Sequence, residues 1–564
     1  MSKQLIECVP NISEGRDPVK IKQVTDVIET VEGVKLLDVD PGKATNRTVI
    51  TFVGEPEQVI KAAFLVIKKA SEIIDMSKHS GEHPRMGATD VCPLVPIAGI
   101  SMEETAAYAH KLGKRVGEEL NIPIYFYENA AATEERRNLA NCRSGEYEGL
   151  NVKLSDPHWK PDAGPAGFND LVKRTGATAI SARDFLVAYN VNLNTTSARR
   201  ANAIAFDIRE GGRVKREGNP ITGKVVEDEN GEAVRIPGTL KAVKGIGWYI
   251  EEYGIAQLSL NLTNISITPV HIAFDEACDK AHKRGLRVTG SELVGLIPLK
   301  AMLDAGKYFL QKQERSLGVS ESELIKIAIK SMGLDDLAPF NPEEKIIEYV
   351  LAADRPKQLI DMDLVAFANE TASESPAPGG GSIAAYVGTL GISLGTMVAN
   401  LSSHKRGWDD KWEEYSIWAE KGEDYKNELL RLVDEDTNAF NKIMEAFRLP
   451  KSNDVEKQAR KEAVQEATKY AIEIPFNVLE TAYNSMEVMQ AMAQSGLKSS
   501  ISDAGVGALC ARTAVMGAFL NVKINVSGVD DQAFVNEMLS KGEEIQNKAI
   551  ALEAEILKLV EGKL

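Results

Sequence analysis

The sequence predicts an α+β chain, in which two ferredoxin-like βαββαβ subdomains precede an all-α helical-bundle domain. Strand and helix patterns alternate in the same order twice before about residue 350. Beyond that point strand patterns disappear and helical patterns continue to the end. No glycine-rich dinucleotide fingerprint follows a strand, which argues against a single Rossmann sheet. We therefore expect two antiparallel sheets, each with both of its helices on one face.

The first repeat begins with alternating apolar residues and ends with an extra helix and strand. We expect strands at about 3–10, 35–40, 48–54, 90–97 and 122–130, with helices at 18–30, 56–75 and 102–119. The second repeat has expected strands at 184–193, 244–252, 256–264 and 286–295, with helices at 196–210 and 268–284. Residues 218–238 are predicted to form a surface hairpin insertion.

The last third of the chain is expected to be entirely helical. The predicted helices are 360–370, 382–402, 408–448, 454–482, 485–495, 503–520 and 530–562. The predicted organisation is a first subdomain over 1–180, a second over 181–351, a linker at 352–359 and a helical domain over 360–564.

Small residues recur every three to four positions on two of these helices. Gly388, Gly391 and Gly395 lie on one, and alanines follow the same spacing on 503–520. Glycine inside a helix costs about 1 kcal/mol relative to alanine, so a close helix contact must compensate for it. That contact lies either within the bundle or across a dimer interface. The uncharged stretch 375–403 is rich in Gly, Ala, Ser and Thr, which favours a buried helix over a membrane span.

Charge and cysteine usage narrow the class of protein. The 564 residues hold 66 Lys and Arg against 82 Asp and Glu, a net charge of −16. This balance argues against nucleic acid or an anionic membrane as a partner. Five scattered cysteines without a CxxC pair give neither a disulfide framework nor a thiolate zinc site. The N-terminus has no signal-peptide pattern, so we expect a cytoplasmic protein.

The densest polar cluster of the first half is MSKHSGEHPRMGATD, at 76–90. His79 and His83 have a spacing that zinc ligands use, but no third ligand lies nearby and Gly81 and Pro84 interrupt any helix. A histidine satisfied within a loop is the plainest alternative. The functional interpretation is that Pro84 keeps His83 extended, with its imidazole available for proton transfer.

Two further segments carry charges whose role the sequence leaves open. Asp38 and Asp40 lie on one side of a strand, beside a turn with Arg47. These charges could equally form a solvated patch of salt bridges without a function. The segment 161–178, with Lys173 and Arg174, is either a linker or a pocket wall that faces an anion.

The helical half offers a glycine turn and an isolated acid. Gly379, Gly380, Gly381 and Ser382 directly precede a helix, where free amides and the helix dipole favour an anion; a plain N-cap needs fewer glycines.

Asp436 interrupts an apolar stripe made by Tyr425, Leu429, Leu432, Val433, Phe440, Ile443, Met444 and Phe447. A carboxylate on a core-facing stripe is expected to have a raised pKa, which suits a general acid or base. A buried aspartate that caps a neighbouring helix is the alternative. Asp434 and Glu435 are expected to be solvated.

Together, these segments resemble a known pair of enzyme families. The motifs ECVPNISEG, LLDVDPGKATNRTVITFVG, IDMSKHSGEHPRMGATDVCP, KGIGWY and GSELVGLIPLKA resemble formiminotransferases over 1 to about 350. PAPGGGSIAA, LVDEDTNAF, EAFRLPK and FLNVKIN resemble formimidoyltetrahydrofolate cyclodeaminases over about 360–564. In this order they resemble the bifunctional formiminotransferase-cyclodeaminase family of histidine degradation.

The resemblance implies two reactions on one folate. The formimino group of N-formimino-L-glutamate passes to N5 of tetrahydrofolate, a co-substrate expected to be polyglutamylated. Ring closure to 5,10-methenyltetrahydrofolate then releases ammonia, and no metal is implied. The resemblance makes His83 the proton shuttle and Asp436 the acid of the second step. It makes Asp40 the acid that either orients His83 or protonates the intermediate. It places Asn11, Arg47 and Arg85 at the first site and Gly379, Gly380, Gly381 and Ser382 at the second, and it assigns folate contacts to Gly164, Pro165, Lys173, Arg174 and Gly176.

The resemblance also implies a homo-oligomer, with circular octamers known in the family, and no nucleic-acid or membrane partner. The chain departs from the animal pattern in the hairpin 218–238 and within 168–174. A cyclohydrolase-like second activity, or a folate-binding scaffold with a decayed site, remain the alternatives.

Overall fold

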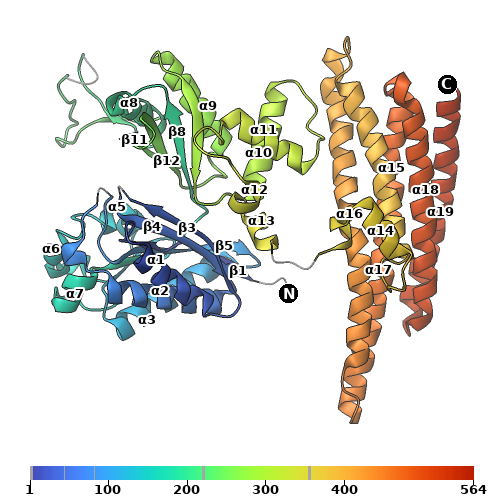
Figure 1. Cartoon of the computed structure of the whole chain (residues 1–564), viewed down its shortest axis with the longest axis horizontal. Coiled ribbons are helices and arrows are strands. Elements are labelled where there is room, and N and C mark those ends of the chain that lie inside the picture. Colours follow the sequence, from blue (N-terminus) through green and yellow to red (C-terminus); the bar gives the residue numbers. More distant parts are fainter. Residues whose placement is uncertain (1–3, 44, 82, 219–222, 354–356) are drawn as a thin grey trace. The chain divides into compact units, whose positions relative to one another are not determined.

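A computed structural model describes residues 4–43, 45–81, 83–218, 223–353 and 357–564. The chain folds into two compact units, with boundaries at 305/306, 327/328 and 354/355. The first unit contains the sheets, and the second is helical (Figure 1). The mixed α+β chain with a helical C-terminal region is thus confirmed.

The first sheet has seven strands. β4 and β5 each pair antiparallel with the interrupted strand β1/β2, and β3 pairs with the outer edge of β4. β7 pairs with β5 in parallel, and β6 then pairs with β7. The strands are β1 (Leu5–Cys8), β2 (Asn11–Ile12), β3 (Val34–Gly42), β4 (Arg47–Gly54), β5 (Thr89–Ala98), β6 (Ile124–Glu128) and β7 (Thr178–Ala182).

Long helices cover one face of this sheet, and short helices cover part of the other (Figure 1). The long helices bury apolar stripes against Ile6, Ile50, Phe52 and Leu94. They are α1 (Pro18–Glu29), α2 (Pro56–Ile73) and α3 (Met102–Leu120). The short helices are α4 (Glu134–Arg137), α5 (Leu139–Cys142), α6 (Leu150–Ser155) and α7 (Asp170–Thr175). Because side chains alternate along a strand, Asn11 and Val49 lie on the face away from α1–α3.

The sequence missed the strand β7. Residue 178 was expected to end the segment 161–178, and no element was expected at 179–182, but residues 178–182 are all buried between β5 and β6. The sequence TAISA is short and mostly small, and it lacks the alternation that marks a half-buried strand, because both of its faces are covered.

The second sheet has the order β11-β12-β8-β13 and is antiparallel throughout. Its elements are β8 (Val187–Leu193), α8 (Ala198–Ile208), β11 (Val243–Ile250), β12 (Ile255–Leu262), α9 (Val270–Lys283) and β13 (Val288–Val294). The helices α8 and α9 both pack on this sheet, as predicted. The strand β9 (Arg213–Val214), just before the predicted insertion, pairs with β10 (Arg235–Ile236) at its end, so the hairpin begins earlier than expected. Residues 219–222 lie outside the described part of the chain.

Long helices form the second unit. They are α14 (Leu364–Thr371), α15 (Gly380–Ser403), α16 (Trp412–Arg448), α17 (Asp454–Ser495), α18 (Ile501–Asn525) and α19 (Gln532–Glu561). The prediction of separate helices at 454–482 and 485–495 was wrong, because α17 is continuous over both and also includes Pro475. Residues 354–356 of the predicted linker lie outside the described residues.

Residues 306–327, predicted as part of the second subdomain, belong to the helical unit. They include the second half of α10 (Leu299–Lys312) and most of α11 (Glu321–Met332). The loop between these helices contacts the bundle directly. The amide of Asn400 donates to the carbonyl of Gly318 at 2.7 Å, and a Cβ on Gly318 would lie 2.2 Å from the backbone of Ala419. The short helices α12 (Pro342–Lys345) and α13 (Ile347–Ala352) follow in the first unit.

The predicted close approach of small residues occurs within the bundle, between α15 and α18. A Cβ on Gly391 would lie 2.8 Å from the carbonyl oxygen of Gly507, and the reverse distance is also 2.8 Å. Two helices, α15 and the segment 498–528, are long and apolar enough to span a membrane by composition, and 61% and 50% of their most apolar windows are buried inside the protein. Buried helices of a folded bundle have this composition too.

The glycine contact yields a stability prediction. We expect Gly391→Ala to lower the free energy of unfolding of the bundle by about 1–3 kcal/mol, because the new methyl group meets backbone that cannot move alone. Urea titration followed by far-ultraviolet circular dichroism measures the change. The matched control is Gly505→Ala on α18, whose methyl group would have ordinary contacts at 3.4 Å. Equal stability of the two variants would contradict the close approach.

Candidate functional sites

His83 lies in the loop that leads into β5. Its Nδ1 is 2.7 Å from the carbonyl oxygen of Pro84, so Nδ1 carries the proton and Nε2 keeps the lone pair. Burial, followed by the charge of Arg47, lowers the pKa of His83 to about 4. The imidazole is therefore neutral at pH 7. Since the unfolded chain takes up this proton at higher pH, His83 makes the fold less stable as pH falls from about 6.5 to about 4.

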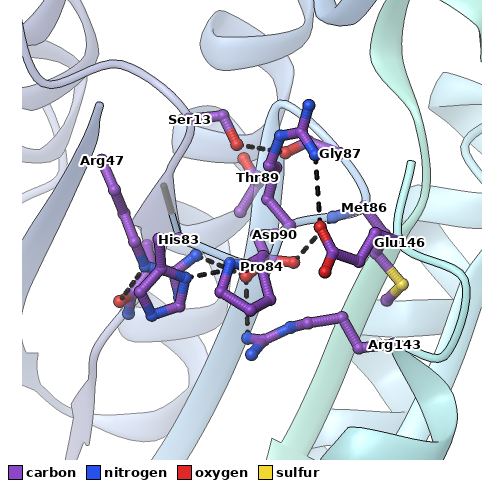
Figure 2. A network of polar contacts seen from close by, with 12 residues as sticks. Ser13, Arg47, His83, Pro84, Met86, Gly87, Thr89, Asp90, Arg143 and Glu146 are labelled. Carbon is purple, nitrogen blue, oxygen red and sulfur yellow. Dashed lines mark hydrogen bonds and ion pairs between the residues drawn. The ribbon is translucent and has the colours of Figure 1, made fainter. Parts of the chain in front are cut away.

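A buried carboxylate, Asp90, lies beside this loop and is held by two arginines (Figure 2). Arg47 forms a short ion pair with Asp90, Arg143 donates to the same oxygen at 2.8 Å, and the Met86 amide donates to the other at 3.0 Å. Burial alone would raise the pKa of Asp90, but the two guanidinium groups reverse the shift and hold it below its ordinary value. Asp90 thus remains a fixed anion that orients two cations.

Asn11 joins the same cluster, as expected. Its side-chain oxygen accepts from Nε of Arg47 at 3.1 Å, while its amide donates to the Val9 carbonyl at 2.8 Å. The buried Nε of Arg143 has no hydrogen-bond partner among the described residues. The cluster therefore presents a neutral imidazole and two oriented guanidinium groups, a suitable set for an anionic substrate that must exchange a proton.

His79 and Arg85 are engaged in a different way from His83. His79 donates through Nε2 to the Asn46 carbonyl at 3.0 Å and accepts at Nδ1 from Arg85. The Arg85 guanidinium also forms ion pairs with Glu148 at 2.7 Å and Glu146 at 3.3 Å. Both ring nitrogens of His79 are therefore occupied, and Arg85 holds the loop rather than facing an open site. No group of three potential metal-ligating side chains lies together in the described part of the chain.

Asp40 lies on the same sheet face as Asn11 but two strands away. In register it is opposite Val49, which is opposite Asn11, so the two Cα atoms are about 10 Å apart. Burial and then Asp38 raise the pKa of Asp40, Lys345 lowers it, and Glu292 raises it. The charges that act on His83 are Arg47, Arg143 and Asp90. The two predicted partners therefore lie in different electrostatic surroundings.

The segment 164–176 contributes mainly backbone contacts. Gly164 and Gly176 both have positive φ angles, and a Cβ on either would lie 2.2 Å from a carbonyl oxygen, of Ile122 and Met86 respectively. Arg174 donates to the carbonyls of Ser71 and Glu72 at the end of α2, and Tyr147 donates to the Lys173 carbonyl. Gly176 forms a β-bridge with Gly87, so the end of the segment lies beside the loop that carries His83. Pro165 is half-buried.

The second cluster forms where the first turn of α15 contacts α16. Asp436 accepts from the Ser382 amide at 2.9 Å and from the Ser382 hydroxyl at 3.1 Å. A Cβ on Gly381 would lie 2.1 Å from Asp436 Oδ1, so a larger residue there would displace the carboxylate, and Gly379 is the N-cap residue. Burial raises the pKa of Asp436, although the two bonds from Ser382 oppose this shift. The predicted glycine turn and the predicted acid therefore form one site.

The neighbours of Asp436 differ from the expectation. Asp434 was predicted to be solvated, but it is buried and accepts from the Leu359 amide at 2.7 Å. Glu435 is half-buried and accepts from the Tyr470 hydroxyl. The second half of the stripe was expected to face the core, yet Phe440 is 42% exposed and Phe447 50%. The prediction for Phe440 and Phe447 failed because the end of α16 extends past most of the bundle (Figure 1).

Sequence reasoning missed three residues of these sites. Asp90 and Arg143 are 53 residues apart and meet only in the fold, and the irregular segment around Arg143 has no pattern that would single it out. On α18, the Asn521 side chain lies against the first turn of α15, 3.1 Å from the position of a Cβ on Gly380. Asp90 and Asn521 lie within motifs that carried the family resemblance, which is the only signal that marked them.

Comparison with known proteins defines the class of each half. The family profile described as "Formiminotransferase domain, N-terminal subdomain" matches residues 5–183, and "Formiminotransferase domain" matches 188–352. The profile described as "Formiminotransferase-cyclodeaminase" matches 363–544.

Relatives of three kinds align with the chain. A formimidoyltransferase-cyclodeaminase of Gallus gallus is 42% identical over 559 residues, covering 99% of each chain. A glutamate formimidoyltransferase of Thermoplasma acidophilum is 42% identical, covering 54% of this chain and 92% of its own. A methenyltetrahydrofolate cyclohydrolase of Methylorubrum extorquens is 35% identical, covering 35% of this chain and 95% of its own. The chain therefore belongs to the formimidoyltransferase-cyclodeaminase family.

The arginine cluster yields a prediction about His83. Replacing Arg143 by Met removes one of the cations that depress the pKa of His83, so we expect that pKa to move upward from about 4 toward 6.5. NMR titration of labelled histidine side chains, with His83→Gln for assignment, measures the shift. The control is Arg137→Met, since Arg137 is an exposed arginine paired with Glu134. An unchanged His83 pKa in Arg143→Met would contradict the electrostatic coupling.

Proposed function

We propose that this chain transfers the formimino group of N-formimino-L-glutamate to tetrahydrofolate and then cyclises the product with release of ammonia. The observation that carries the proposal is the pair of separate sites within one chain. One contains a neutral, proton-accepting His83 beside two oriented arginines, and the other contains Asp436 with a raised pKa on a glycine turn. Family membership supports the reaction, and the geometry supports the choice of residues.

In the first step, N5 of tetrahydrofolate attacks the formimino carbon and glutamate leaves. Nε2 of His83 accepts the N5 proton and returns it to the departing glutamate nitrogen, which balances the exchange. Arg47 and Arg143 bind the carboxylates of the substrate, and Asp90 keeps both guanidinium groups in place. Arg85 positions the loop through Glu146 and Glu148. We keep Asp40 in the proposed site as a second acid of this step, since it shares the sheet face of Asn11.

In the second step, N10 attacks the same carbon and the ring closes. Asp436 accepts the N10 proton and delivers it to the departing nitrogen, which leaves as ammonia. The Ser382 amide and hydroxyl orient the carboxylate, while the amides of Gly380 and Gly381 at the start of α15 face the substrate. Tetrahydrofolate serves as co-substrate in both steps, with a polyglutamyl tail, and no metal takes part.

We assign these steps to the predicted domains. The two subdomains, 1–180 and 181–351, carry the transfer, the linker is 352–359, and 360–564 carries the cyclisation. Profile matches over 5–183, 188–352 and 363–544 support these boundaries. The second sheet has the strand order of a ferredoxin-like fold, and the first has that order extended by β7 and β6. We assign folate contacts to 164–176, through its backbone, and a cytoplasmic location.

A homo-oligomer, up to the octamer of the family, is also part of the proposal. Exposed apolar side chains gather on α15 and α18, which pack against each other. They are Leu390, Met397, Leu401, Val506, Leu509, Leu520 and Ile524. An apolar surface of this kind on paired helices is typical of an interface between subunits.

The second half of the chain is similar to a methenyltetrahydrofolate cyclohydrolase, so a cyclohydrolase-like reaction is the alternative activity for this half. In that case water, rather than N10, would react at the one-carbon unit. Release of ammonia from 5-formiminotetrahydrofolate distinguishes the two reactions. A non-catalytic folate scaffold is disfavoured, because both sites retain groups that can move a proton.

Reciprocal variants test the proposal. We expect His83→Ala to abolish formimino transfer while ammonia release from supplied 5-formiminotetrahydrofolate continues, and Asp436→Asn to do the reverse. Methenyl absorbance and ammonia, followed together from tetrahydrofolate and N-formimino-L-glutamate, measure both steps. Loss of both activities from either single change in a folded protein would refute two separate sites.

The glycine turn yields a second prediction. We expect Gly381→Ala to lower the rate of ammonia release about a hundredfold, since a methyl group 2.1 Å from Oδ1 must displace the Asp436 carboxylate. Formimino transfer, which uses the other unit, should not change. Normal ammonia release by this variant would show that the position of the Asp436 carboxylate is unimportant.

A further inference from the structure

The exposed half of the α16 stripe runs from Asp436 toward the end of the helix. Phe440, Ile443 and Phe447 follow Asp436 at four-, three- and four-residue steps, which keeps them on one helix face. Eleven residues at 1.5 Å each separate Phe447 from Asp436 by about 16.5 Å. Phe440 and Phe447 are 42% and 50% exposed, and Met444, at the edge of this face, is 40% exposed. We call this face the α16 track.

A basic cavity of about 330 Å³ lies at the far end of the α16 track. Of the described residues, four cationic side chains and no acidic ones line it, together with Phe447, Val464 and Gln465; the cations are Lys451, Lys457, Arg460 and Lys461. Lys457 and Lys461 pair with Asp454 and Asp530 outside the lining, at 2.9 Å each. The cavity wall therefore keeps a net positive charge on a chain whose total is −16.

An aromatic surface that begins at a proton-transferring carboxyl and ends in a cationic cavity matches one kind of molecule. Such a molecule has a reacting centre at one end, a flat aromatic body, and carboxylates at the other end. A second copy of the chain fits less well, because cations at the end of the track would repel those of an identical surface.

We propose that the α16 track and its basic cavity form the binding site for the aromatic body and the glutamate carboxylates of the folate that reacts at Asp436. This inference rests on the proposed function, since it takes the folate from there. Phe440 and Phe447 contact the ring system, and Lys451 and Lys457 receive the carboxylates. The exposure of these aromatic side chains then has a cause: they are covered when substrate is bound.

The test compares two substrates and two kinds of variant. The substrates are 5-formiminotetrahydrofolate and its analogue without glutamate, 5-formiminotetrahydropteroate, and ammonia release is measured for each. We expect Lys451→Gln/Lys457→Gln to raise KM for the first about tenfold with kcat unchanged, because two charge contacts are lost. The same variant should leave KM for the analogue unchanged. Phe440→Ser should raise KM for both substrates, since the aromatic body is common to them.

Lys541→Gln/Lys548→Gln is the matched control. Both lysines lie on α19 and pair there with Glu537 and Glu544, so the same charge is removed far from the track in the sequence. Its KM values should equal those of the wild type. Unchanged KM in Lys451→Gln/Lys457→Gln, or an equal rise for both substrates, would overturn the inference. So would an altered oligomeric state of Phe440→Ser on gel filtration with KM unchanged. If the wild type releases no ammonia at all, the proposed function fails as well.

Discussion

Burial of a carboxylate beside a backbone amide is the constraint on which both clusters depend. Asp90 accepts from the Met86 amide and Asp436 from the Ser382 amide, so each main chain must approach the acid closely. An unpaired buried carboxylate would cost several kcal/mol. The local backbone is shaped accordingly, with Gly87 and Gly176 in contact beside Met86 and Gly381 in contact with Asp436. The glycines in these motifs follow from the acids that they must approach.

The sequence predicted the elements whose burial is one-sided. The helices α1, α2, α8 and α9 and most strands appeared near their expected positions, because one apolar face produces a readable period. Prediction failed where that condition is absent. The strand β7 is buried on both faces and made of small residues, while the break expected at 483–484 lies within the continuous helix α17. The tail of α16 has an apolar face that stays largely exposed within the described chain.

The two sites differ in how much the sequence could reveal. Asp436 and the glycine turn were singled out separately, by a broken stripe and by three adjacent glycines, and the fold joins them through hydrogen bonds from Ser382. The first site is assembled from a loop, three strands and the irregular segment after α5. Arg143 reaches Asp90 from 53 positions away, and no local period reports such a contact. Long-range electrostatic pairs become visible only when the chain is folded.

Asp90 and Asp436 are both largely buried, yet their pKa values shift in opposite directions. The two carboxyl groups are therefore suited to different tasks. Asp90 faces two guanidinium groups, which outweigh its desolvation, so it stays ionised and cannot transfer a proton at neutral pH. Asp436 accepts hydrogen bonds from a neutral amide and a hydroxyl of Ser382. These bonds lower its pKa by less than desolvation raises it. It can therefore hold a proton and release it, as a general acid and base must. Beside Asp90, burial and the same arginines depress the pKa of His83, so its imidazole stays neutral and suits the proton transfer that we propose for it. The number of nearby cations thus decides whether a buried aspartate of these clusters stays ionised or can hold a proton.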